Sequence, residues 1–304
     1  MPKVSIIIPT HNRARLLRAA MDSVLRQAFQ DFEIIVVDDA SQDQSEEVVR
    51  SFADPRIRYL RHATNKGQGA SRNAGIQYAS GEYIALLDDD DEWLPHKLEK
   101  QVQRLDDSPA KIGLVYTGFC KVAGPDKRVI AQVLPEKRGS LFEDMCFRNW
   151  IGTCSTVLLR RSCFEKIGWF DETLPSGVDY DMWLRLAKQF DIDCIREPLV
   201  LYTVHPHSIS TNYETRIRGA EAQFRKYGSF FAKNRKGYSR RYLSLGVHYC
   251  YQGDLTKGRE AFRKGIQLNP LEVRHYFNFC LSLFGAGTFR KFKQFKESRF
   301  AFRA

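Results

Sequence analysis

The stretch Tyr83-Ile84-Ala85-Leu86-Leu87-Asp88-Asp89-Asp90-Asp91 decides the fold class of this chain. Its five apolar residues predict a buried strand, and four carboxylates follow where that strand ends. Crowded carboxylates repel one another, and a hard divalent cation such as Mg2+ or Mn2+ relieves the repulsion because it takes oxygen ligands. On an extended backbone Asp88 and Asp90 point to the same side. The alternative is a solvated acidic turn before a helix that begins near Pro95.

Strands and helices alternate around this stretch. Apolar runs predict further strands at residues 4–9, 33–38 and 57–60. Periodicity of 3.6 residues predicts helices between them, at residues 16–25, 48–52 and 70–79. Alternation of this kind predicts right-handed crossovers and an α/β fold with a mostly parallel sheet flanked by helices.

Ligands of such sheets bind beyond the carboxyl ends of the strands. The polar side chains found there belong to Thr10-His11-Asn12, Asp38-Asp39 and Asp88 to Asp91. We therefore expect these three groups to share one crevice.

The chain after residue 111 has a mixed pattern. Strands are predicted at residues 115–119 and 155–159, and helices at 164–168 and 179–190. We place the α/β domain at residues 1–212 and a small, basic, all-α extension at residues 213–304.

Charge is unevenly distributed between these two parts. Of the 47 Lys and Arg residues 20 lie in residues 213–304, together with only 6 of the 36 Asp and Glu residues. Such a basic region favours an anionic partner or surface. The extension has no recognised nucleic-acid-binding module, so nucleic acid is not expected as the partner.

Targeting signals are not evident in the sequence. No apolar run is long enough to span a bilayer, and the short run before Pro9 is not typical of a secretory signal. The seven scattered cysteines are typical of reduced thiols. We expect a cytoplasmic protein, or one held peripherally at the inner face of the membrane.

A helical hairpin is predicted at about residues 239–272. Its spacing is similar to that of one tetratricopeptide unit, carried by Tyr242, Leu245, Gly246, Tyr249, Gly258, Phe262, Gly265 and Pro270. An unrelated hairpin is the alternative. A single unit cannot bury its apolar face alone, so it must pack on the rest of the chain or on another copy, as a homo-oligomer.

The end of the chain places five phenylalanines among basic residues: Phe289, Phe292, Phe295, Phe300 and Phe302. On a helix these residues fall within an arc of about 160°. Such a helix can lie in an anionic membrane interface. Alternatively, the phenylalanines cap the open face of the hairpin.

Five motifs in order resemble the family 2 glycosyltransferases of the GT-A fold over roughly residues 2–210. They are Val4-Ser5-Ile6-Ile7-Ile8-Pro9-Thr10-His11-Asn12-Arg13, Ile35-Val36-Val37-Asp38-Asp39-Ala40-Ser41, Gly69-Ala70-Ser71-Arg72-Asn73-Ala74-Gly75, Leu87-Asp88-Asp89-Asp90-Asp91-Glu92-Trp93 and Val178-Asp179-Tyr180-Asp181-Met182-Trp183. The resemblance does not extend beyond about Tyr213.

The resemblance implies an inverting, metal-dependent hexosyl transfer from a nucleotide-diphosphate sugar, most simply a UDP-sugar. By this match Asp179 is the catalytic base, and Asp90 and His205 are ligands of Mn2+ or Mg2+. The nucleotide-sugar-binding residues implied by the match are Pro9, Thr10, Asn12, Asp39, Arg72, Asp88 and Asp89. The acceptor is expected to be a glycan or lipid-linked, in cell-surface polysaccharide synthesis.

Several assignments have alternatives. Asp89 and Asp91 could form the working acidic pair, Asp181 could replace Asp179 as base, and His207 could replace His205. Trp93 and Trp183 are expected in the core rather than against a sugar.

Besides nucleic-acid binding, two rival functions are considered. One is a catalytically weak GT-A scaffold that acts through the helical tail. Another is a nucleotidyltransferase, which needs a glycine-rich loop after the first strand, and Thr10-His11-Asn12-Arg13 lacks glycine. Dinucleotide-binding and P-loop motifs are absent from the same position.

Overall fold

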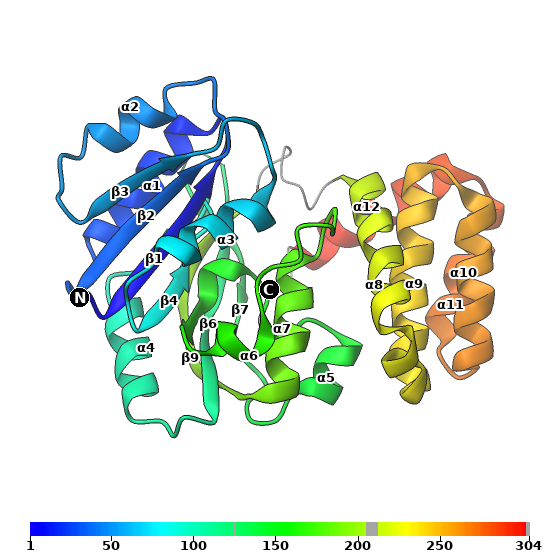
Figure 1. Cartoon of the computed structure of the whole chain (residues 1–304). Helices are drawn as coiled ribbons and strands as arrows, with labels where there is room; N and C mark the ends of the chain where they lie inside the picture. The colour runs from blue at the N-terminus through cyan, green and yellow to red at the C-terminus, as the bar shows by residue number, and fades with distance from the viewer. Residues whose placement is uncertain (125, 205–211, 302–304) are drawn as a thin grey trace. The chain divides into compact units, whose positions relative to one another are not determined.

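The computed structural model describes residues 1–124, 126–204 and 212–301, with side chains of the last helix described up to Lys293 (Figure 1). Contacts divide the chain into two compact units. The sheet unit comprises Met1–Leu141, Trp150–Glu172 and Val178–Val204. The helical unit comprises Phe142–Asn149, Thr173–Gly177 and the described part of His205–Ala304. Two short segments from before residue 212 therefore belong to the helical unit.

The first half of the sheet is parallel. Strand β1 (Val4–Thr10) lies between β2 (Phe32–Asp38) and β4 (Tyr83–Leu86), and β3 (Ile57–Arg61) pairs with β2. Every residue of β1 and β2 is buried, because helices cover both faces of a parallel sheet. The connecting helices are α1 (Ala14–Leu25), α2 (Ser45–Arg50) and α3 (Gln68–Tyr78). The strands and helices predicted here are confirmed to within a few residues.

The second half of the sheet is mixed. The described strands form one sheet in the order β3-β2-β1-β4-β8-β6-β9-β5, and β7 pairs with β6. The added strands are β5 (Glu92–Trp93), β6 (Ile112–Ala123), β7 (Arg128–Val133), β8 (Val157–Arg160) and β9 (Asp191–Thr203). Helices α4 (Lys97–Asp106), α6 (Cys163–Ile167) and α7 (Val178–Gln189) and the 3-10 turn η1 (Cys154–Thr156) complete the sheet unit. The predicted α/β class with a separate helical region is confirmed.

Strand β9 was not predicted. It includes the exposed Arg196 and Glu197 and also Pro198, so it has no sustained apolar alternation. It is held by a long parallel pairing with β6, which is interrupted by register shifts near Gly118. Pairing across the sheet, rather than local propensity, makes this segment a strand.

The topology collects the acidic turns at one edge. Thr10 pairs with Asp38 at the ends of β1 and β2, and Leu86 at the end of β4 pairs with Ile7 of β1. Because these strands are parallel, the turns that follow them leave the sheet on the same side.

The helical unit contains α5 (Phe142–Phe147), α8 (Tyr213–Lys233), α9 (Arg235–Gln252), α10 (Leu255–Leu268), α11 (Val273–Leu283) and α12 (Ala286–Ala301). Gly253, with a φ of 108°, ends α9, and the Asp254 carboxylate caps α10 at the Lys257 N–H. Helices α9 and α10 form a hairpin where one is predicted; its tetratricopeptide class stays a prediction. No helix in the described part of the chain is long and apolar enough to cross a membrane.

Glycine lets the helices of this unit approach closely. A Cβ at Gly265 would lie 1.9 Å from Cε1 of His275, and one at Gly258 would lie 2.5 Å from Sγ of Cys250. Phe289 of α12 is fully buried and packs with Cys250 and Phe262, so this phenylalanine covers the hairpin. The side chains of Phe295, Phe300 and Phe302 lie outside the described residues.

Candidate active site

The turn after β1 is tied to its neighbours through Thr10 and Asn12. Thr10 Oγ1 donates to Asp89 Oδ2 at 2.8 Å. Asn12 adopts a φ of 54°, which asparagine tolerates better than most residues. Its N–H donates to Ser41 Oγ at 2.9 Å, and its Oδ1 accepts from the Gln42 N–H at 2.7 Å. Pro9 is buried within β1, opposite Val37.

Asp39 holds the loop that leads into α3. Its carboxylate accepts the backbone N–H groups of Lys66, at 2.8 Å, and Gly67, at 2.7 Å, and it pairs with Nδ1 of His62 at 2.8 Å. Burial raises the pKa of Asp39, but these hydrogen bonds outweigh it and lower the pKa below its ordinary value. A carboxylate has about four acceptor positions. One position on Oδ2 therefore stays available for a further donor.

Arg72 reaches the acidic turn from the first part of α3. The residue is 3% exposed, and its guanidinium donates a charge-assisted hydrogen bond to Asp88 Oδ1 at 2.6 Å. Nε of Arg72 is buried and has no hydrogen-bond partner among the residues that the structure describes. The arginine therefore holds one carboxylate of the turn and keeps one N–H group unused.

Arg13 pairs with two other aspartates of the turn. One of its terminal nitrogens lies 3.0 Å from Asp89 Oδ1 and 2.9 Å from Asp90 Oδ2. Burial raises the pKa of Asp89 to about 6; Arg13 opposes the rise, and Asp90 adds to it. Asp89 thus faces Thr10 and Arg13 inside the protein.

Asp91 is the most deeply buried aspartate of the turn. Ser155 Oγ donates to its Oδ2 at 2.6 Å, and the Thr203 N–H donates to its Oδ1 at 3.1 Å. Burial, together with the charges of Asp90 and Asp88, raises the pKa of Asp91 well above its ordinary value. Holding this group ionised beside two other carboxylates costs free energy.

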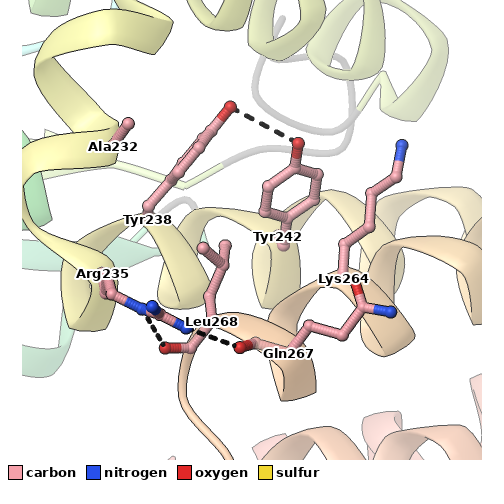
Figure 2. A pocket seen from close by; sticks show the side chains of 7 residues that line it. All are labelled: Ala232, Arg235, Tyr238, Tyr242, Lys264, Gln267 and Leu268. Atoms are coloured by element: carbon pink, nitrogen blue, oxygen red, sulfur yellow. Dashed lines mark hydrogen bonds between the residues drawn. The ribbon is translucent and has the colours of Figure 1, made fainter.

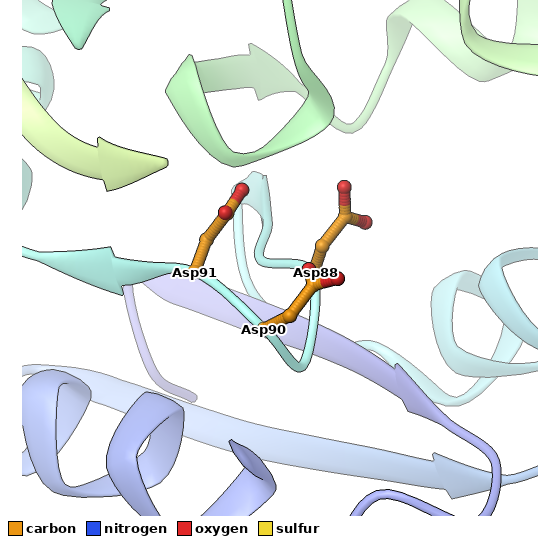
Figure 3. Close-up of side chains that lie close together, drawn as sticks. All are labelled: Asp88, Asp90 and Asp91. Carbon is orange, nitrogen blue, oxygen red and sulfur yellow. The ribbon is translucent and has the colours of Figure 1, made fainter. Parts of the chain in front are cut away.

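Three of these carboxylates fit a divalent cation. Asp88, Asp90 and Asp91 each offer an oxygen, and these oxygens lie within 4.8 Å of one another (Figure 3). A hard cation takes such carboxylate oxygens and lowers the repulsion that raises the pKa of Asp91. The donor set therefore suits Mn2+ or Mg2+ on chemical grounds. His205, the other predicted ligand, lies outside the described residues.

Asp179 lies in the first turn of α7, partly exposed. A Cβ at Gly69, near the start of α3, would lie 3.3 Å from Cγ1 of Val178, so α7 begins against α3. Although part of the residue is exposed, burial of its carboxyl group raises the pKa of Asp179 to about 6; the charge of Arg72 lowers it in part, and that of Asp88 adds to the rise. The structure thus brings Asp179 to the same edge as Asp88 and Arg72.

Asp181 has a different environment. It is fully buried, and its Oδ2 pairs with the Arg185 guanidinium at 2.9 Å. Trp93 and Trp183 are both buried in the core, as expected. The indole N–H of Trp93 donates to the Ser155 carbonyl at 2.8 Å.

Three contributors to the site were not assigned from the sequence: Arg13, Ser155 and the Thr203 N–H. Arg13 directly follows Asn12 in the turn after β1, and this position is the sequence feature that could have identified it as a site residue. Ser155 lies 64 residues from Asp91, and its segment shows only strand propensity. No local pattern identifies such partners.

The helical unit contains a separate hollow of about 430 Å3 (Figure 2). Tyr238 and Tyr242 line it, with their hydroxyls 3.4 Å apart, and Lys264 reaches its edge. Arg235 donates to the carbonyls of Gln267 and Leu268 at the end of α10. The described residues that line the hollow include no carboxylate, so it does not resemble the acidic edge of the sheet.

The sequence of this chain is similar to those of known glycosyltransferases. The family model described as glycosyl transferase family 2 matches residues 5–168, more than half of the chain. The glycosyltransferase RP339 of Rickettsia prowazekii is 36% identical over 67% of this chain and 64% of its own length. A relative from Rickettsia felis aligns over only 32% of its length. This chain therefore spans less than two thirds of these relatives.

A shorter relative aligns more fully. The Escherichia coli protein named UDP-Glc:alpha-D-GlcNAc-diphosphoundecaprenol beta-1,3-glucosyltransferase WfgD is 32% identical over 69% of this chain and 80% of its own.

Solved structures show the same fold. S. aureus TarS 1-349 in complex with UDP covers 96% of this chain at 20% identity, with a TM-score of 0.60 and 91% of its own chain aligned. The mannosyltransferase PcManGT of Pyrobaculum calidifontis, in complex with GDP-Man and Mn2+, covers 99% of this chain at 17% identity, with a TM-score of 0.61 and 85% of its own chain aligned. The predicted GT-A fold is confirmed.

Proposed function

Because the chain belongs to glycosyltransferase family 2, we propose that it transfers a hexose from a UDP-sugar to a hydroxyl group of its acceptor, with inversion at the anomeric carbon. The observation that carries the proposal is the meeting of Asp88, Asp90 and Asp91 with Arg72 and Asp179 at one edge of the sheet. Such an edge can hold the diphosphate of the donor beside a carboxylate that acts as the catalytic base.

The donor is bound by polar groups at the strand ends. Asp39 Oδ2 accepts a hydrogen bond from the imide N–H of the uracil base, since a carboxylate offers only acceptors. Pro9, Thr10 and Asn12 shape the turn against the nucleotide, and the positive charge of Arg72, which holds Asp88, lies beside the diphosphate. Asp88 and Asp89 were predicted to face the ribose or the donor sugar. This assignment stays a prediction; in the structure Asp88 binds Arg72, and Asp89 binds Thr10 and Arg13.

A divalent cation, Mn2+ or Mg2+, would be held by Asp90 with Asp88 and Asp91, and His205 is a further proposed ligand. When bound, it would neutralise charge that develops on the leaving diphosphate.

Asp179 removes the proton from the acceptor hydroxyl. It must be ionised to do so, and a pKa of about 6 leaves it mostly ionised at neutral pH while keeping it a stronger base than an ordinary aspartate. The attacking oxygen then forms its bond to the anomeric carbon as the bond to the diphosphate breaks on the opposite face. Asp181, which is committed to Arg185, is not available for this step.

We propose a glycan or lipid-linked acceptor in the synthesis of a cell-surface polysaccharide. The name of the WfgD relative, which includes a diphosphoundecaprenol-linked sugar, supports this choice. An acceptor of that kind would bring the protein to the membrane surface.

A thermal-shift screen tests the donor. UDP, GDP and dTDP, each with and without their sugars, are added with Mn2+, Mg2+ or a chelator. We expect UDP with Mn2+ to raise the melting temperature most, because a ligand at about 100 times its Kd stabilises the native state by about 2.7 kcal/mol. Transfer of labelled sugar from UDP-hexoses to a polyprenyl-diphosphate sugar is then measured. A response to no nucleotide, or equal responses with chelator, would refute the proposal.

A further inference from the structure

Helix α11 exposes apolar side chains and buries polar ones. His275 and Ser282 are fully buried, and Asn278 is nearly so. The opposite side shows Val273, Tyr276, Phe277, Cys280 and Leu283 to solvent. At 100° per residue these five lie within an arc of about 120°. This is the reverse of an ordinary surface helix, whose apolar stripe faces the core.

The apolar surface continues beyond α11. Phe284, in the turn before α12, is 72% exposed, and Leu271, before α11, is 89% exposed. Phe292 of α12 is 40% exposed, and its ring lies 5.4 Å from that of Phe277. We call Leu271, Val273, Tyr276, Phe277, Leu283, Phe284 and Phe292 the α11 surface. Contiguous exposed apolar side chains of this kind mark an interaction site.

Specific contacts hold α11 in this orientation. The hydroxyl of Ser239 lies 2.8 Å from Nε2 of His275 and donates to the Gly265 carbonyl at 2.8 Å. Asn278 Nδ2 donates to the Arg274 carbonyl at 2.6 Å. Because Gly265 has no Cβ, His275 fits against α10, and a rotation of α11 would lose this fit.

The flanks of the α11 surface are basic. Lys291 and Lys293 flank Phe292 in the sequence, and α11 contains no acidic residue. The acidic neighbour Glu272, at the start of α11, is paired with Arg274 at 2.6 Å. A second copy of the chain on this surface would bring two basic rims together, and like charges repel.

We propose that the α11 surface docks on an anionic lipid bilayer. Exposed aromatic and aliphatic side chains enter the headgroup boundary, while Lys291 and Lys293 beside Phe292 meet the lipid phosphates. This assignment differs from docking by the terminal helix alone, because Phe289 of that helix points into the hairpin core. The helical unit would then hold the enzyme at the surface on which lipid-linked glycans are carried.

Vesicle co-sedimentation of the full chain tests this inference. The main variant is Phe277→Asp with Phe284→Asp, both at exposed positions, and circular dichroism and thermal unfolding verify its fold. The matched control is Tyr78→Asp with Val129→Asp, which changes two exposed apolar residues of the sheet unit. A third variant is Lys291→Gln. The vesicles contain phosphatidylcholine alone or phosphatidylcholine with phosphatidylglycerol.

We expect the wild type and the matched control to sediment with the phosphatidylglycerol vesicles. Partitioning should fall at least tenfold in the main variant and about fivefold in Lys291→Gln at low salt. Equal partitioning of the wild type and main variant would overturn the proposal, as would the absence of binding to anionic vesicles. A concentration-dependent dimer that the main variant abolishes, without vesicle binding, would assign the surface to a second copy.

Discussion

Replacement of Asp179 by asparagine tests whether this residue is the catalytic base, because it removes the charge and keeps the size of the side chain. Burial raises the pKa of this carboxyl from 3.8 to about 6, with Arg72 opposing the rise and Asp88 adding to it. A shift of about two pKa units corresponds to about 3 kcal/mol. Keeping Asp179 ionised therefore costs the native state up to that amount, and asparagine removes the charge.

The stability of this variant should depend on pH in a defined direction. The pKa of the folded state lies above the unfolded value, so the native state binds the proton more tightly. The cost is complete above about pH 6, falls as the pH drops toward the unfolded pKa of 3.8, and is absent well below that value, where both states are protonated. We expect Asp179→Asn, without cation or nucleotide, to unfold several degrees higher than wild type at about pH 8, and the difference to disappear well below about pH 4.

Activity should change in the opposite direction. Loss of the base lowers kcat by about 10²–10⁴, while UDP affinity is kept. For the wild type, kcat/KM should fall about tenfold between about pH 7 and pH 5, because the ionised fraction falls by that factor for a pKa of about 6. Calorimetric titration of UDP and a rate profile against pH measure both quantities.

Asp181→Asn is the control, because it also removes a carboxylate from α7 but one that pairs with Arg185. It should destabilise the chain and keep kcat in the folded fraction. Near-normal kcat in Asp179→Asn, beside an inactive but folded Asp181→Asn, would refute the assignment of Asp179.

Three further predictions concern the metal, the base pocket and the helical unit. Asp90→Asn should abolish the Mn2+ dependence of UDP binding in calorimetry, and UDP affinity of the wild type that is equal with and without chelator would contradict this. Asp39→Asn should weaken UDP binding about 10- to 100-fold, the effect of losing a hydrogen bond to a charged group, and unchanged affinity would exclude it from the base pocket. Gly265→Ala should lower the unfolding free energy of the helical unit by about 1–3 kcal/mol, because its Cβ would lie 1.9 Å from His275, whereas Gly287→Ala has nothing within 4 Å and should be neutral or stabilising. Hydrogen exchange in α9 to α11 measures this difference, and equal protection in the two variants would refute the packing argument.

The local sequence pattern was sufficient to predict the strands and helices of the first half of the sheet. Strands such as Val4–Thr10 are apolar on both faces, and helices with one apolar stripe separate them, so period and length identify each element. The parallel order then requires Thr10, Asp38 and Asp88 to lie at one edge, and the acidic run there suggests a cation from composition alone.

Tertiary structure decided the remaining features. Strand Asp191–Thr203 exists because it pairs with Ile112–Ala123, and Asp91 is buried because Ser155 and the Thr203 N–H satisfy its oxygens. The raised pKa of Asp179 depends on where the packing of α7 against α3 places it. Likewise, the apolar side chains on one side of α11 (Val273–Leu283) face solvent because the contact between His275 and Gly265 fixes the orientation of that helix. Periodicity reports only neighbours within one element, whereas burial and charge interactions arise between residues that the folded chain brings together.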